Sequence, residues 1–229
     1  AYNESATIAT LNLSYYPKER GPYNLNTLDM GADGKFITPK EKWGGITRKM
    51  DVRDFETANV EYIEFWLMDP FVNNNNPNYE KNNGGSLYIN LGEISEDVLK
   101  DGKKFFENGL PINDDPDAID YTVWGKVPKR QSTVYAFDNS TGADARRKQD
   151  VGLNGLSTEE EFQFDTYIKY LADLEAKLSP AAREEFRNNP LSPLNDPAGD
   201  TYHYYRGSDY DQRELSILDR YKYYNNTEG

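Results

Sequence analysis

The stretch NVEYIEFWLMDPF, residues 59–71, decides the expected fold. Side chains of an extended chain alternate between two faces, and here both faces are apolar. The large apolar residues concerned are Tyr62, Ile63, Phe65, Trp66, Leu67 and Met68. A membrane-spanning strand usually keeps one polar face towards the lumen, so the pattern favours a strand covered on both sides. We therefore predict a central strand of a β-sandwich, ended by Asp69 and Pro70.

The surrounding residues predict more strands. SLYINLG (86–92) is expected to pair with the first strand as a long hairpin across the Asn-rich loop 73–85. Alternation at 7–13 and the segments YTVWGKVP (121–128) and STVYAFD (132–138) predict further extended chain. Strands with turn-rich connections indicate a mainly β protein with a sandwich architecture.

The apolar period changes in the second half of the chain. Ser157 and Glu160 have capping-box spacing. Apolar residues then recur three or four positions apart, at Phe164, Ile168, Leu171, Leu174 and Leu178. Ser179 followed by Pro180 predicts the start of a second helix. We predict a helical insertion near 157–189 within an otherwise β protein.

Composition excludes several classes of function. The formal net charge of the 229 residues is −13, and an acidic surface repels the phosphates of nucleic acids. The absence of cysteine excludes disulfides, thiol nucleophiles and thiolate metal sites. The single histidine, His203, excludes a multi-histidine metal site. No run approaches the roughly 20 apolar residues that a membrane helix needs, so this segment is not expected to span the membrane.

Acidic residues supply candidate metal ligands but no convincing catalytic pair. Glu61 and Glu64 fall on opposite faces of a strand and cannot act together from there. The loop NDDPDAID, residues 113–120, offers hard oxygen ligands for a structural calcium ion without EF-hand spacing. Its candidate ligands are Asp114, Asp115, Asp117 and Asp120. A merely solvated acidic loop is the alternative. We expect no enzymatic activity and no cofactor besides such an ion.

Aromatic residues are candidates for stacking on sugar rings. Those considered as ligand-facing are Trp43, Trp124, Tyr204 and Tyr205. Tryptophans buried in a core and packed tyrosines are the alternative explanation.

Specific motifs follow one another along nearly the whole chain. They are YYPKERGPYN (15–24), PKEKWGGITRKM (39–50), DFETANVEYIEFWLMDPF (54–71), GSLYINLGEISEDVLKDGKKFFENGLP (85–111), TVWGKVP (122–128), QDVGLNGL (149–156), DPAGDTYHYYRGSDYD (196–211) and RYKYYNNTEG (220–229). Together they resemble the SprA/Sov family, the gliding-motility and secretion proteins of Bacteroidetes. At fold level, the paired segments around residues 62–92 are also similar to the galactose-binding-like jelly roll.

The resemblance implies a soluble segment, 1–229, of a very large outer-membrane protein that forms the translocon of the type IX secretion system. Its implied role is non-enzymatic: a structural or docking domain that supports export of folded cargo proteins and gliding motility. The implied partners are other type IX secretion components and secreted cargo. The implied location is the cell envelope, with the parent in the outer membrane and this segment periplasmic or extracellular. The alternative is a carbohydrate-binding module that holds surface polysaccharide or glycosylated cargo.

Overall fold

The computed structural model describes residues 15–46, 54–65, 67, 85–92, 98–100, 102, 110, 115–130, 152–201 and 208–221. The chain divides into two compact units. The first consists of Ala1–Gly44 together with Ser95–Gly229, and we call it the helical unit. The second, Gly45–Ile94, is called the extended unit. The prediction of a single domain over 1–229 stays a prediction.

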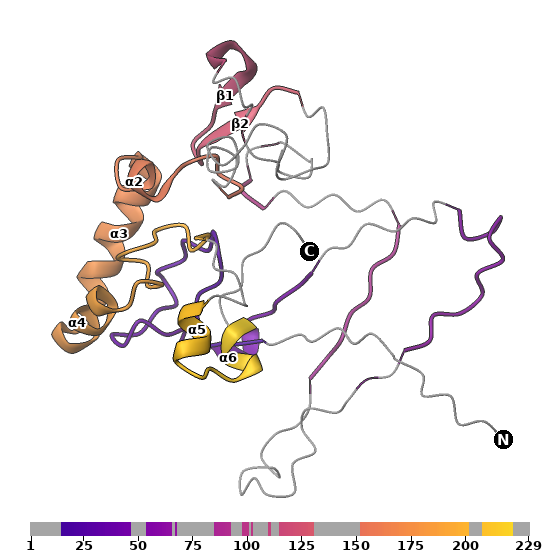
Figure 1. Ribbon diagram of the computed structural model, residues 1–229, viewed down its shortest axis with the longest axis horizontal. Coiled ribbons are helices and arrows are strands. Elements are labelled where there is room, and N and C mark those ends of the chain that lie inside the picture. Colours follow the sequence, from indigo (N-terminus) through magenta and orange to yellow (C-terminus); the bar gives the residue numbers. More distant parts are fainter. Residues whose placement is uncertain are drawn as a thin grey trace, which may run out of the picture. The chain divides into compact units, whose positions relative to one another are not determined.

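All the named elements lie in the helical unit (Figure 1). Its α-helices are α2 (Thr158–Glu161), α3 (Asp165–Lys177), α4 (Pro180–Asn188), α5 (Ser208–Gln212) and α6 (Ile217–Tyr221). Two short 3-10 helices, η1 (Pro39–Glu41) and η3 (Pro116–Ala118), and two strands, β1 (Ile119–Tyr121) and β2 (Lys126–Pro128), complete the set among the described residues. The strands pair antiparallel, with Asp120 opposite Val127.

Local capping chemistry fixes the starts of α2 and α4. The Ser157 hydroxyl accepts a hydrogen bond from the Glu160 amide at 3.4 Å, and the Glu160 carboxylate accepts one from the Ser157 amide at 2.9 Å. The Ser179 hydroxyl accepts from the Ala182 amide at 3.2 Å, and Pro180 occupies the first turn. Both arrangements satisfy amides that a helix start leaves unpaired. The capping predictions are confirmed.

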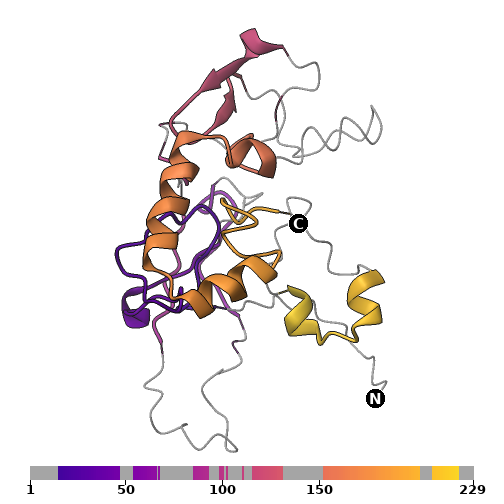
Figure 2. The same cartoon turned by 90° about the vertical axis from the view of Figure 1, so that its left-hand side faces the viewer.

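Helices α3 and α4 pack on the segment 15–46 (Figure 1). The buried residues of this first core cluster are Met30, Phe36, Tyr170, Leu174, Leu178 and Ala182. The turn between the two helices is tied to the same segment, because the Ser179 amide donates to the Ala32 carbonyl at 2.8 Å. Figure 2 shows α4 leaving the end of α3 in a new direction, with the 15–46 segment beside both.

A second core cluster lies at the other end of α3. It consists of Tyr23, Leu99, Leu156, Tyr167 and Ala198, with Trp124 packed against it. The β1–β2 hairpin joins this end, because the Lys126 amide donates to the Asn154 carbonyl at 2.8 Å. The buried stripe of α3 is therefore Tyr167, Tyr170 and Leu174. Ile168, which the apolar period placed on that stripe, is instead exposed.

The predicted β-sandwich, with its jelly-roll analogy, is wrong. The strands among the described residues are one hairpin of three residues a side, apart from an isolated bridge between Met30 and Phe36. Helices do occupy the predicted range near 157–189, but they build the core rather than interrupt a sheet. Alternating side chains make a segment suitable for an extended conformation. A sheet also needs a second segment whose backbone amides and carbonyls pair with it, and alternation does not supply that segment.

The segment predicted as the central strand has no such backbone partner among the described residues. Residues 60–65 are neither helical nor paired as a strand, and Ile63 and Phe65 are exposed rather than covered. The same holds for residues 86–91. No backbone hydrogen bond between described residues joins the two segments, so these residues do not form the predicted hairpin. Trp66, Met68 and Asp69-Pro70 lie outside the described residues, as do the strands predicted at 7–13 and 132–138.

Candidate functional site

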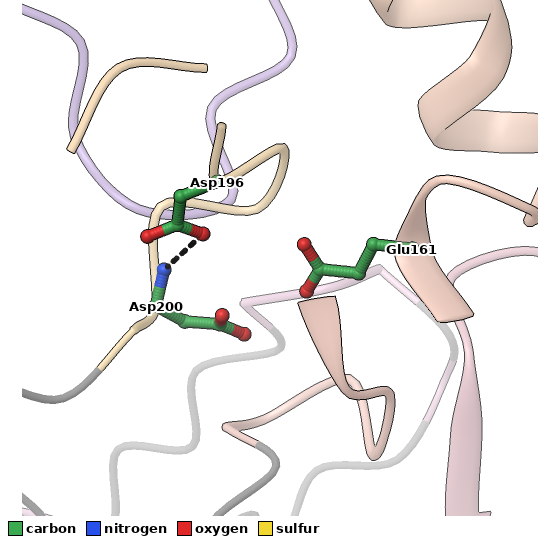
Figure 3. Close-up of side chains that lie close together, drawn as sticks. All are labelled: Glu161, Asp196 and Asp200. Carbon is green, nitrogen blue, oxygen red and sulfur yellow. Dashed lines mark hydrogen bonds between the residues drawn. The ribbon is translucent and has the colours of Figure 1, made fainter. Parts of the chain in front are cut away.

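Three carboxylates from distant parts of the helical unit gather in its interior. Glu161 ends α2, whereas Asp196 and Asp200 lie in the loop after α4. One carboxylate oxygen of each lies within 4.8 Å of the others. Figure 3 shows Glu161 pointing from α2 towards the loop that carries the two aspartates. We call these residues the buried carboxylate cluster.

Asp196 shapes its own loop. Its Oδ1 accepts hydrogen bonds from the amides of Gly199 at 2.9 Å and Asp200 at 3.3 Å, and its Oδ2 accepts from Thr201 at 3.1 Å. Gly199 has a φ of +77°, a conformation that glycine adopts at little cost. The sequence DPAGDT therefore closes into a tight turn around one side chain.

Glu161 ties that loop to α2. Its side chain is fully buried, and it accepts hydrogen bonds from the Ala198 amide at 3.0 Å and from the Asn154 side chain at 2.7 Å. The same Asn154 amide group donates to the Tyr167 hydroxyl on α3 at 2.9 Å. The carboxylate thus joins the loop, α2 and α3 through hydrogen bonds that burial makes expensive to break.

Asp200 and Arg20 complete the connection to the N-terminal segment. Asp200 accepts a hydrogen bond from the Tyr23 hydroxyl at 2.7 Å, and that hydroxyl accepts one from the Leu153 amide at 2.6 Å. Arg20 donates to the Pro197 carbonyl, and its guanidinium lies 4.8 Å from the centre of the Tyr170 ring. The loop is therefore held from three sides.

Burial sets the protonation of the cluster. Burial raises the pKa of Glu161 to about 7, although hydrogen bonds from Asn154 and Ala198 oppose the shift. Burial and then repulsion from Glu161 raise the pKa of Asp200 to about 8. Ionisation of Glu161 disfavours ionisation of Asp200, because like charges this close repel each other. We infer that the cluster holds at least one proton at neutral pH.

The hydrogen-bond pattern of the cluster indicates a structural role. Its oxygens are hard ligands of the kind that Ca²⁺ and Mg²⁺ prefer. Each of the three carboxylates, however, already accepts hydrogen bonds from this chain: from main-chain amides, the Asn154 side chain or the Tyr23 hydroxyl. The arrangement joins α2, the 196–201 loop and the 20–24 turn into one body.

The predicted calcium ligands do not gather in this way among the described residues. Asp115 caps η3, since its side chain accepts from the Asp117 amide at 2.9 Å. Asp120 belongs to β1, with the Lys129 amine 4.0 Å from its carboxylate. Asp114 lies outside the described residues. Calcium binding at this loop stays a prediction.

The predicted ligand-facing aromatics differ from one another. Trp43 is 83% exposed, as a stacking residue would be. Trp124 is half-buried and packs against the Tyr167 core cluster. Tyr204 and Tyr205 lie outside the described residues. Sugar stacking therefore stays a prediction, for which Trp43 has the required exposure.

A shallow apolar pocket lies within the extended unit. Its volume is about 300 Å³, and it is lined by Phe55, Val60, Glu61, Tyr62, Ile63 and Leu91. Glu61 is the charged residue of a lining that is otherwise apolar or aromatic. The segments 60–63 and 91 thus lie near each other although no backbone hydrogen bond between described residues joins them.

Sequence reasoning missed the buried carboxylate cluster. Asp196 and Asp200 were visible as two acids around a Pro and a Gly in DPAGD, a signal for a tight turn. Glu161 gave no comparable signal, because TEEE is equally typical of an exposed first helical turn. Its contact with the Ala198 amide spans 37 residues of sequence, and no local pattern contains that information.

Comparison with known proteins finds a family match for the C-terminal part of the chain. Residues 169–229 match the family SprA_N, described as a motility related/secretion protein. This match confirms the resemblance to the SprA/Sov proteins over these residues. No curated protein and no solved structure matches the chain. Among the described residues, no helix has the length and apolar character needed to cross a membrane.

Proposed function

We propose that this chain is a non-enzymatic structural and docking module of the type IX secretion translocon, supporting export of folded cargo and gliding motility. The observation that carries the proposal is the family match at 169–229. The match gives the setting, a motility related/secretion protein. The docking role, the cargo and the partner components are the proposal.

The packing of the core clusters supports a folded module that is larger than the matched segment 169–229. Residues 169–229 supply Tyr170, Leu174 and Leu178 to the first core cluster, and segment 15–46 supplies Met30 and Phe36. The buried carboxylate cluster is divided in the same way, because Glu161 lies outside the match while Asp196 and Asp200 lie inside it. The matched residues therefore depend on residues that precede the match to bury their apolar surface.

Deletion of 1–229 from the full-length protein in cells tests the proposal. We expect loss of cargo secretion and of gliding while the remaining protein still reaches the cell envelope. Normal secretion and gliding at normal protein level would reject the proposal.

A pair of point variants on α3 gives a matched control for the deletion. Leu174→Asp places a charge at a fully buried position and is expected to abolish secretion by unfolding the module. Ile168→Asp makes the same chemical change at an exposed position of the same helix and is expected to preserve secretion. Equal secretion by both variants, at equal abundance, contradicts a role for the folded helical unit.

The carbohydrate-binding alternative rests on one observation, the exposure of the Trp43 ring. Aromatic rings bind sugars by stacking, which needs an accessible face. Titration of the purified chain with neutral and acidic polysaccharides, followed by tryptophan fluorescence, tests this function. A signal at millimolar sugar that Trp43→Ala removes supports it, and no signal at that concentration rejects it.

A further inference from the structure

The extended unit exposes apolar side chains at most positions of two short segments. The large ones are between 42% and 82% exposed, and they are Val60, Tyr62, Ile63, Phe65, Leu67, Leu87, Tyr88, Ile89 and Leu91. Single exposed apolar residues are ordinary, but a contiguous series marks an interaction surface. The pocket of about 300 Å³ lies within this surface. We call residues 60–67 and 87–91, Trp66 apart, the exposed apolar surface.

The backbone of the same segments has no hydrogen-bond partner in the part of the chain that the structure describes. Residues 61–65 and 85–91 make no backbone hydrogen bond with any described residue. The turn before residues 61–65 is closed by a hydrogen bond from the Val60 amide to the Phe55 carbonyl at 2.9 Å, and this bond is the last in the series. Unpaired amides and carbonyls in a β-patterned segment form a ready template for another strand.

Charge defines what kind of strand fits. The sequence of the extended unit, residues 45–94, has eight acidic and four basic residues, so its formal net charge is −4. The basic residues of this unit lie outside the described residues, at Arg48, Lys49, Arg53 and Lys81. Glu61 lines the pocket itself. Opposite charges facing each other across a strand pair are stabilising, and like charges are destabilising.

We propose that residues 60–67 bind an extended segment of a partner protein by strand addition, and that the segment is apolar with two basic residues. The basic residues are three positions apart, since Glu61 and Glu64 are three apart and lie on opposite faces of the strand. The intervening positions are apolar, because they face Tyr62 and Ile63. Main-chain hydrogen bonds give the affinity, and the two acids give the register.

A second copy of this chain fits the surface less well. It would bring a second Glu61 and Glu64 to the surface, in a unit whose formal net charge is already −4. Self-association therefore brings like charges together, whereas a basic partner neutralises them.

This inference deepens the proposed docking role by naming the chemistry of the partner, and it rests on that role for its biological setting. Its test uses the purified chain with synthetic peptides, so it can fail while the deletion experiment succeeds, and the reverse. The probe is the fluorescein-labelled peptide Val-Lys-Ile-Val-Lys-Val. Its controls are an acidic peptide with Glu in place of both Lys, and a peptide of the same composition with the two Lys adjacent.

Fluorescence anisotropy measures the dissociation constants. We expect the basic peptide to bind at least about tenfold more tightly than either control peptide. Glu61→Lys with Glu64→Lys is expected to reverse the preference, so that the acidic peptide binds more tightly. The matched control, Glu184→Lys with Glu185→Lys, makes the same charge change on exposed positions of α4 and is expected to alter neither constant.

Three results would overturn the proposal. The first is equal binding of the basic and acidic peptides, which removes the role of the two acids. The second is undiminished binding of two N-methylated peptides, one methylated at the odd residues and one at the even residues, because one of the two must block the amides that face the partner strand. The third is a dimer, detected by sedimentation, that the basic peptide dissociates, since that result assigns the surface to a second copy.

Discussion

The helical unit and the extended unit use the same kinds of apolar side chain to opposite effect. Tyr170 is 3% exposed in the helical unit, whereas Tyr62 is 78% exposed in the extended unit. The difference lies in partners. Tyr170 packs with Met30 and Phe36 from a remote segment, and the hydrogen bonds of its helix are satisfied internally. Tyr62 lies in a segment with neither a packed partner nor a ladder among the described residues. An apolar pattern therefore predicts a capacity for burial, and burial itself needs a second surface.

The largest expected effect comes from truncating the same residue type in both units. Leu174→Ala removes a fully buried side chain and is expected to lower the free energy of unfolding by about 3–4 kcal/mol. Leu87→Ala removes an exposed side chain of the extended unit and is expected to cost less than about 0.5 kcal/mol. Urea unfolding, followed by circular dichroism at a helical wavelength, measures both. Similar losses of unfolding free energy for the two variants would contradict the difference between the units, because they would show that Leu87 is packed.

A glycine beside the buried carboxylate cluster gives the next largest effect. Gly152 has a φ of +61°, and a Cβ there would lie 2.2 Å from the Asp200 carboxylate and 2.5 Å from the Tyr23 hydroxyl. Gly152→Ala is expected to cost about 2–3 kcal/mol, from backbone strain and from the broken Tyr23–Asp200 contact. Gly21→Ala is the control, since a Cβ there meets nothing within 4 Å. A cost below about 0.5 kcal/mol for both variants, in the same urea experiment, contradicts the cluster as a structural centre.

The ionisation of the cluster should make the helical unit depend on pH. Burial raises the pKa of Asp200 to about 8 and that of Glu161 to about 7, whereas carboxyls of an unfolded chain titrate near about 4. Between these values the folded chain binds more protons than the unfolded chain. The contribution to stability is thus fully present below about pH 4 and is lost as pH rises towards about 8.

Asp200→Asn tests this dependence. The amide oxygen can still accept from the Tyr23 hydroxyl, but the buried charge is gone. The free energy of unfolding of the variant, relative to that of the original chain, is expected to rise by about 2 kcal/mol from about pH 5 to pH 8. Urea unfolding at each pH measures both. Glu64→Gln, at an exposed acid of the extended unit, is expected to leave the profile unchanged. Parallel profiles for Asp200→Asn and the original chain would show that the cluster does not titrate in this range.

Local features of the fold could be predicted from the sequence. The starts of α2 and α4 depend on Ser157 and Ser179, whose partners lie three residues away. The buried face of α3 was predicted less well, because counting aliphatic residues selected Ile168 and passed over Tyr167 and Tyr170. A tyrosine that is buried along most of its ring serves the same role in a core as a leucine.

Features that depend on remote partners could not be predicted. The sandwich was inferred from strand patterns, chiefly at residues 59–71 and 86–92, and such patterns do not show which backbone a segment pairs with. The buried carboxylate cluster could not be predicted for the same reason, because Tyr23 and Asp200 are 177 residues apart in the chain. Sequence patterns specify what each segment needs, and only the fold, or a partner protein, decides whether that need is met.

The smallest expected effect compares a local cap in each unit. Ser179 caps α4, and its backbone amide is bonded to Ala32, so Ser179→Ala is expected to lower the free energy of unfolding by about 1 kcal/mol. Asp54 makes a similar cap in the extended unit, since its Oδ1 accepts from the amides of Glu56 at 3.0 Å and Thr57 at 3.1 Å. That turn precedes an unpaired segment, so Asp54→Ala should leave the unfolding of the helices unchanged when followed by circular dichroism. An equal loss for Asp54→Ala would mean that the two units unfold together, and the extended unit would then be part of one cooperative structure.

Adding the basic peptide sharpens the comparison: once residues 60–67 have a strand partner, the same Asp54→Ala change should weaken peptide binding while Ser179→Ala should not.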